Sequence, residues 1–211
     1  MPVWQALREE LKDKNFEVIS VALDTRGKAA AEQWIRAAEA QHPSLIDTQH
    51  IVVELYGTRN VPSGIWIDEE GRIVRPAETA SGRVRQPGAT EATTHDKYLN
   101  ALRDWVEKGP KSIYVLTQEE IKQRTNRPTA EDAQAAAYFA LGAYLYQQGR
   151  LTDAIPHFKQ AHALMPENWN YKRQAFSLGN PEEDYGTTIQ KEQQAPGAPP
   201  FRVPLDMPDL S

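Results

Sequence analysis

The 211-residue chain contains no cysteine and only five histidines, so few of its side chains could carry chemistry. The absence of cysteine excludes disulfides, thiolate metal sites and every reaction in which this chain supplies its own thiol. His157 and His162 lie five residues apart, which is the wrong spacing for one helical face. Ser63, Ser81 and Ser112 lie in no Gly-x-Ser-x-Gly motif and have no identifiable base. We therefore predict no catalytic residue, no metal site and no cofactor.

Other residues could still bind a partner. Asp24 ends an apolar segment, and functional groups in α/β proteins often follow the carboxyl end of a strand. Because no partner is visible for this carboxylate, we interpret Asp24 as a helix cap. The aromatic residues between positions 138 and 146 are interpreted as helix-packing core. The large amphipathic residues 169–174 are interpreted as a capping helix rather than a partner-binding surface.

The overall charge excludes further function classes. Lys and Arg total 24 and Asp and Glu total 29, which gives a net charge of −5, and no basic stripe is present. Binding to nucleic acid is therefore not expected. No apolar run approaches the roughly 18 residues of a membrane span, and no signal-peptide core is visible. We expect a cytoplasmic protein without a membrane segment.

Hydrophobic spacing predicts alternating helices and strands in the first half of the chain. The expected elements are a helix from Pro2 through Leu11, a buried strand at 16–23, a helix at 27–41, an extended piece at 44–46, a helical turn at 51–56, a hairpin of 64–67 with 72–75, an exposed loop at 77–93, and a helix from Thr94 to Gly109. This alternation is typical of an α/β fold.

The second half is predicted to be helical. Thr117 with Glu120 and Thr129 with Asp132 have the spacing of capping boxes, which begin helices. The expected helices are a short one after Thr117, a long one from Thr129 to about 148, one at 151–165 and one at 168–178. Residues 181–211 hold six of the fifteen prolines, and we expect a tail that is extended, mobile or laid on a surface.

The spacing of residues 138–166 resembles the tetratricopeptide repeat. The matching residues are Tyr138, Leu141, Gly142, Leu145, Gly149, Ala154, Phe158, Ala161 and Pro166. We expect Gly142 and Ala154 to be small because two antiparallel helices cross there, and Phe158 to fill the space between them. A single repeat cannot bury its own apolar face. It must lean on the first domain, on the helix from Asn168 or on another subunit.

Residues 1–108 resemble the thioredoxin-like fold, in its TlpA/ResA-type redoxin branch. Three features carry the resemblance: Val61-Pro62-Ser63 before the first hairpin strand, the 68–72 loop, and the extra helix at 27–41. The resemblance implies that Pro62 is cis and lies against an active-site dithiol. It also implies that Val61 offers backbone groups to an extended peptide. Val61 and Pro62 are accordingly our candidate substrate-binding residues.

The chain departs from that family at its start. The resemblance implies a first strand and then a Cys-x-x-Cys motif at the N-terminus of the first helix, where the helix dipole lowers a thiol pKa. Residues 1–7 resemble the helix just beyond this motif, so we hypothesise that Met1 is an internal methionine of a longer reading frame. The absent strand would lie between the 16–23 and 64–67 strands. Without it, these strands must pair directly or leave backbone groups unmet, at about 1–3 kcal/mol each. We expect a domain that melts at low temperature or aggregates through a strand edge.

These patterns together predict a truncated three-layer α/β/α thioredoxin-like domain at 1–110, a connector at 111–128, a tetratricopeptide hairpin with a capping helix at 129–180, and a proline-rich tail at 181–211. The implied activity is thiol–disulfide (antioxidant) oxidoreduction, which this chain cannot perform because it has no sulfur for the mixed disulfide. The alternative is a non-catalytic interaction scaffold. A peroxidase of the peroxiredoxin kind is a third possibility and would need an upstream cysteine. The expected partner is a protein or peptide bound at the Pro62 loop or at the repeat, and a homo-oligomer is compatible with each alternative.

Overall fold

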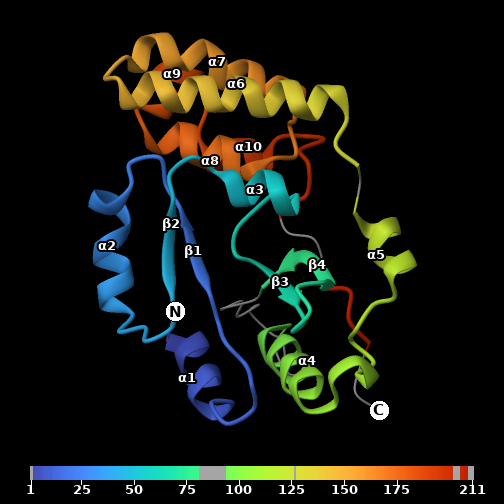
Figure 1. The fold of residues 1–211 in the computed structure, drawn as a ribbon. Helices are drawn as coiled ribbons and strands as arrows, with labels where there is room; N and C mark the ends of the chain where they lie inside the picture. Colours follow the sequence, from blue (N-terminus) through green and yellow to red (C-terminus); the bar gives the residue numbers. More distant parts are fainter. Residues whose placement is uncertain (1, 81–93, 126, 202–204, 209–211) are drawn as a thin grey trace.

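The computed structural model of the chain describes residues 2–80, 94–125, 127–201 and 205–208 (Figure 1). The first half contains α1 (Pro2–Glu10), β1 (Ser20–Leu23), α2 (Lys28–Ala37), β2 (Ser44–Asp47), α3 (Ile51–Tyr56), β3 (Ser63–Ile67), β4 (Ile73–Thr79) and α4 (Thr94–Lys108). The second half contains a short 3-10 turn, η1 (Gly109–Lys111), then α5 (Gln118–Arg124), α6 (Ala130–Gln147), α7 (Leu151–Leu164), α8 (Trp169–Ser177), α9 (Pro181–Tyr185) and α10 (Ile189–Gln194). The fold is therefore mixed α/β with a helical second half.

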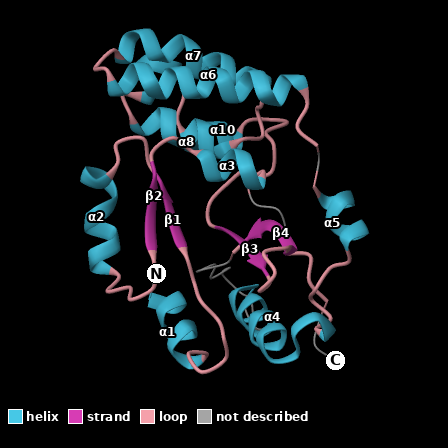
Figure 2. Ribbon diagram, in the orientation of Figure 1, coloured by secondary structure: helices cyan, strands magenta, loops and turns pink. Residues whose placement is uncertain are grey.

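The strands form two separate two-stranded sheets rather than one continuous sheet (Figure 2). β1 and β2 run parallel, with Ser20 opposite Ser44. β3 and β4 form the predicted antiparallel hairpin, whose loop contains Gly71 at φ 77°. β4 continues to Thr79, so the loop predicted at 77–93 is wrong at its start, and positions 81–93 lie outside the described residues. Within the described ranges β1 does not pair with β3. Of the two outcomes expected without a central strand, direct pairing is therefore wrong, and no described strand pairs with the second edge of β1 or of β3.

β1 is shorter and more exposed than the sequence predicts. Only Ser20–Leu23 is strand, each of its residues is half-buried, and the neighbouring Ile19 is 63% exposed. Phe16 packs instead against the core of α1 and α4. A parallel strand is buried when helices cover both faces of its sheet and other strands flank it. Among the described residues β1 has a strand on one edge only, so the prediction of a buried strand at 16–23 is wrong.

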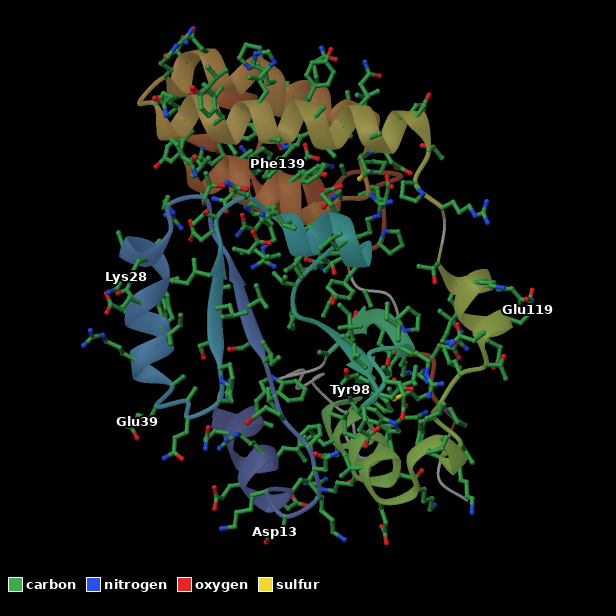
Figure 3. The ribbon with its side chains drawn as sticks, in the orientation of Figure 1. Asp13, Lys28, Glu39, Tyr98, Glu119 and Phe139 are labelled. Carbon is green, nitrogen blue, oxygen red and sulfur yellow. The ribbon has the colours of Figure 1, made fainter. Side chains whose placement is uncertain are left out.

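Trp66 of β3 lies at the centre of the first core. Its ring stacks on Trp105 of α4 with centroids 5.0 Å apart, and its indole N–H donates to the Tyr98 hydroxyl at 2.9 Å. Gly64 lacks a side chain at the point where a Cβ would overlap that hydroxyl. Leu7 of α1 is buried in the same cluster. This core holds α1, the hairpin and α4 together, with Tyr98 directed toward the hairpin (Figure 3).

Both predicted capping boxes are present. The Thr117 side chain accepts from the backbone N–H of Glu120, and the Glu120 carboxylate accepts in return from the backbone N–H of Thr117. Thr129 and Asp132 make the same pair of bonds at the start of α6. Each box satisfies two backbone N–H groups that a helix start leaves unpaired. The predicted starts of α5 and α6 are confirmed.

α6 and α7 form the predicted helical hairpin. Gly142 of α6 faces Phe158 of α7, and a Cβ on the glycine would lie 2.8 Å from two carbons of the Phe158 ring. Phe158 and Ala154 are fully buried. The two helices therefore approach closely because one presents no side chain where the other presents an aromatic ring. The predicted roles of these three residues are confirmed.

The inner face of the hairpin rests on α8 and α3. Phe139 of α6 stacks on Tyr171 of α8 with ring centroids 4.2 Å apart, and Val53 of α3 belongs to the same buried cluster. The Tyr171 hydroxyl donates to the carboxylate of Glu54 on α3. Figure 3 shows Phe139 between α6 and the helices below it. Two of the expected supports, the first domain and the helix after Asn168, therefore cover the repeat.

The prediction of an extended tail over 181–211 is wrong for its first part. α9 and α10 are short helices, because Asn180 and Thr188 each cap a helix start with a side-chain oxygen. Beyond them, the Trp169 indole N–H donates to the Pro200 carbonyl at 3.2 Å. Met207 is buried in the first core. The described part of the tail therefore packs against both halves of the chain.

Candidate functional site

The loop before β3 contains the two residues that the sequence singles out. The Val61–Pro62 peptide bond is cis, as the resemblance implies. Pro62 is exposed, and its carbonyl accepts from the backbone N–H of Ala80 at 3.1 Å, which closes the end of the hairpin. The loop is therefore fixed at its junction with β3 while the proline ring faces solvent.

Both backbone groups of Val61 are already hydrogen-bonded within the chain. Its N–H donates to the side-chain oxygen of Asn60 at 2.8 Å, and its carbonyl accepts from the Arg173 guanidinium of α8 at 3.0 Å. The resemblance implies instead that these groups are offered to an incoming peptide. A peptide could pair with the Val61 carbonyl only after Arg173, which is exposed, moved aside.

α8 holds the rest of this loop as well. The Asn170 side chain donates to the Thr58 carbonyl at 2.8 Å, and the Asn170 backbone N–H donates to the Arg59 carbonyl at 3.3 Å. The Asn60 side chain donates to the carbonyl of Phe201. The helical half of the chain therefore clamps residues 58–61 from two sides. The predicted capping helix does cover the repeat, and it also fixes the loop of the first half.

A buried polar cluster lies where β1 and β2 meet the helical half. The Thr25 backbone N–H donates to the Gln174 side-chain oxygen at 3.0 Å. His50 Nε2 lies 3.2 Å from both the Thr25 hydroxyl and that same oxygen. Burial lowers the pKa of His50, against the opposing pull of the Asp47 carboxylate. The imidazole is therefore neutral at pH 7, and the cluster joins three elements.

His50 also has an unusual backbone conformation. It is the N-cap residue of α3 with φ 58°, in the left-handed region that side chains other than glycine rarely adopt. Its ring meets Phe139 of α6 edge-on, at 4.9 Å between centroids. Its Nδ1 is buried with no hydrogen-bond partner among the described residues. The sequence does not single out Thr25, His50 or Gln174, because their contacts join distant positions.

Asp24 is not the helix cap that the sequence predicts. The N-cap residue of α2 is Gly27, three positions later, and no side chain caps this helix start. The Asp24 carboxylate instead accepts from the backbone N–H and the guanidinium of Arg26, both at 2.9 Å, and the Asp24 carbonyl accepts from the Gly27 N–H. Asp24 therefore stabilises the turn that leads from β1 into α2.

An open, mostly apolar depression lies between β1 and α2. It is lined by the four residues of β1, by Asp24 after them, by Leu45 of β2 and by residues of α2 that include Ala31, Trp34 and Ile35. Trp34 is 69% exposed and Leu45 of β2 is 55% exposed. The sequence places Trp34 on the apolar face of its helix. On that face Ala31 is buried and Ile35 is half-buried, so the exposed part of the face is Trp34.

The described residues show no other arrangement with obvious chemistry. No group of three or more His, Asp or Glu side chains in the described ranges is placed to hold a metal ion. None of the described helices combines the length and apolar character needed to cross a membrane.

Comparison with known proteins identifies one segment of the chain. The sequence profile of the tetratricopeptide repeat matches residues 135–168, which run from α6 to the start of α8. No curated protein and no solved structure matches the chain. The match confirms the repeat predicted within 129–180, and it assigns no family to residues 1–110.

Proposed function

We propose that the chain is a non-catalytic interaction protein, in which a cytoplasmic thioredoxin-like domain carries a tetratricopeptide hairpin. Tetratricopeptide repeats generally serve as protein-binding units. The lack of cysteine supports a binding role over a redox role for this chain. The alternation of strands and helices in the first half supports the thioredoxin-like part of the proposal.

The observation that carries the proposal is the exposed apolar face of α6. Its inner face is buried against α7 and α8, as expected for one repeat. On the outer face, Leu141 is 42% exposed and Tyr144, three residues later, is 58% exposed. These two residues are neighbours on the helix surface. A helix that is apolar on both faces is normally covered on both, and repeats achieve this by stacking against another helical pair. We infer that a helical partner protein covers Leu141 and Tyr144.

Substitution on this outer face tests the proposal. We expect the double variant Leu141→Glu with Tyr144→Glu to remain folded, because both side chains are exposed, and to lose the stoichiometric partner that the unsubstituted chain retains. Gln134→Glu, also exposed on α6, is the matched control and keeps the partner. The measurement is affinity capture of the partner by each chain, followed by cross-linking with a cross-linker placed at position 144 or at position 134. Capture that is equal for both variants, or cross-linking from 134 rather than 144, contradicts the proposal.

A thiol–disulfide role is the second candidate, and the Val61-Pro62 sequence directly before β3 favours it. The thiols would have to come from outside these 211 residues. Reduction of insulin disulfides by a longer polypeptide that includes an upstream Cys-x-x-Cys motif, and not by the present chain, would support this candidate.

A further inference from the structure

The outer edge of β1 carries unpaired backbone groups. Ser20 donates its N–H to Pro43 and Asp24 donates to Asp47, so alternate residues of the strand bond to β2. In a parallel pair the intervening residues point their N–H and C=O groups the other way. Val21 and Leu23 therefore direct these groups to the opposite edge, where no described strand pairs with β1.

The nearest other sheet has an open edge as well. β3 pairs with β4 on one side only, and in the described part of the chain no strand lies on its other side. Figure 2 shows the two strand pairs apart, with no strand drawn between them. Each unpaired edge is a template for a further strand.

The surroundings of the β1 edge are apolar and electrically neutral. The depression beside it presents consecutive residues of β1 together with Ala31, Trp34 and Ile35 of α2. Leu45 of β2, the partner of Val21, lines it too, so the depression lies over the face that the two strands share and runs along β1. The carboxylates at either end are already paired, Glu17 with Arg8 at 2.6 Å and Asp24 with Arg26 at 2.8 Å. The edge therefore offers no free charge to a ligand.

We propose that this edge binds an extended, uncharged, apolar segment of another polypeptide, which adds to β1 as a strand. The proposal rests on the proposed function and specifies a second kind of partner contact, separate from the outer face of α6. Hydrogen bonds to Val21 and Leu23 provide the pairing, and the depression beside Trp34 takes the apolar side chains. This is recognition by strand addition, in which the main chain gives affinity and alternate side chains give specificity.

A second folded copy fits this edge less well. β1 has four residues, so it spans about 13 Å at 3.3 Å per residue. Pairing of two such edges alone falls far short of the roughly 1,200 Å² that a stable protein interface buries. A single extended segment needs no such area, because it also uses the apolar depression alongside the strand.

The probe is a fluorescent, end-blocked peptide of alternating valine and threonine, compared with the same peptide methylated on every backbone nitrogen. Val21→Pro removes the N–H at the open edge and leaves those of Ser20, Ala22 and Asp24 that face β2. Val21→Thr keeps that N–H and is the matched control. We expect binding by the unsubstituted chain and by Val21→Thr, binding weaker by about tenfold or more for Val21→Pro, and no binding of the methylated peptide.

Three outcomes overturn the proposal. Equal binding of both peptides shows apolar adhesion without strand pairing, and this comparison needs no variant to fold. A concentration-dependent dimer that the peptide disrupts assigns the edge to a second copy. Failure to bind the peptide, in a chain that still captures its partner through Leu141 and Tyr144, removes the strand proposal and leaves the proposed function in place.

Discussion

Replacing Phe158 with alanine is expected to lower the free energy of unfolding by about 3–5 kcal/mol, because this ring is fully buried where α6 and α7 cross. Gly142→Ala adds a Cβ that would lie 2.8 Å from the same ring, and we expect it to cost about 1–3 kcal/mol. Urea unfolding followed by circular dichroism measures both changes.

The double variant Gly142→Ala with Phe158→Leu tests whether the stability lost in Gly142→Ala comes from contact with the Phe158 ring or from a general effect on α6. The smaller leucine makes room for the new methyl group. The double variant is therefore expected to lose less stability than Gly142→Ala and Phe158→Leu lose when each is measured alone and the two losses are added. Ala140→Ser, exposed on α6, is the control and should change stability by less than about 0.5 kcal/mol. Strict additivity would contradict direct contact between the two positions.

Mild acid is expected to destabilise the chain through its buried histidines. Burial lowers the pKa of His162 from 6.5 to about 4, and burial likewise lowers the pKa values of His50 and His42. Below pH 6.5 these histidines take up protons in the unfolded chain while they stay neutral in the folded chain. The free energy of unfolding therefore falls as the pH drops from about 6.5 toward 4. His162 alone accounts for about 3 kcal/mol across that range, and the other two act in the same direction.

Urea unfolding at pH 7 and pH 5 measures this loss. His162→Gln cannot take up a proton, so its stability should depend less steeply on pH than that of the unsubstituted chain. His157→Gln, on the same helix and half-buried against Tyr138, is the control and should keep the steep dependence. An unchanged slope in His162→Gln would assign the acid sensitivity to other groups.

Local sequence signals predict the elements of this fold well. The Thr117 and Thr129 capping boxes predict the starts of α5 and α6, and Gly149 predicts the break before α7, because each effect acts within a few residues of the chain. The cis bond at Val61–Pro62 is likewise predicted, although through a resemblance rather than through local physics.

The errors come from contacts between distant residues. The 16–23 segment reads as a buried strand because its composition is apolar, but burial depends on neighbours that the sequence does not reveal. The cluster of Thr25, His50 and Gln174 joins positions up to 149 residues apart, so no local pattern indicates it. A distant contact also affects Val61, because Arg173 of the helical half donates to the carbonyl that the resemblance leaves open to a peptide.

The open edge of β1 is tested most directly by hydrogen exchange of its individual amides, measured by NMR at neutral pH. We expect Ala22 and Asp24, whose N–H groups face β2, to exchange slowly, and Val21 and Leu23 to exchange much faster. Addition of the strand peptide should slow only the latter pair. Equal protection of all four amides in the free chain would mean that β1 is already paired on both edges, and would contradict the proposal that this edge accepts a further strand.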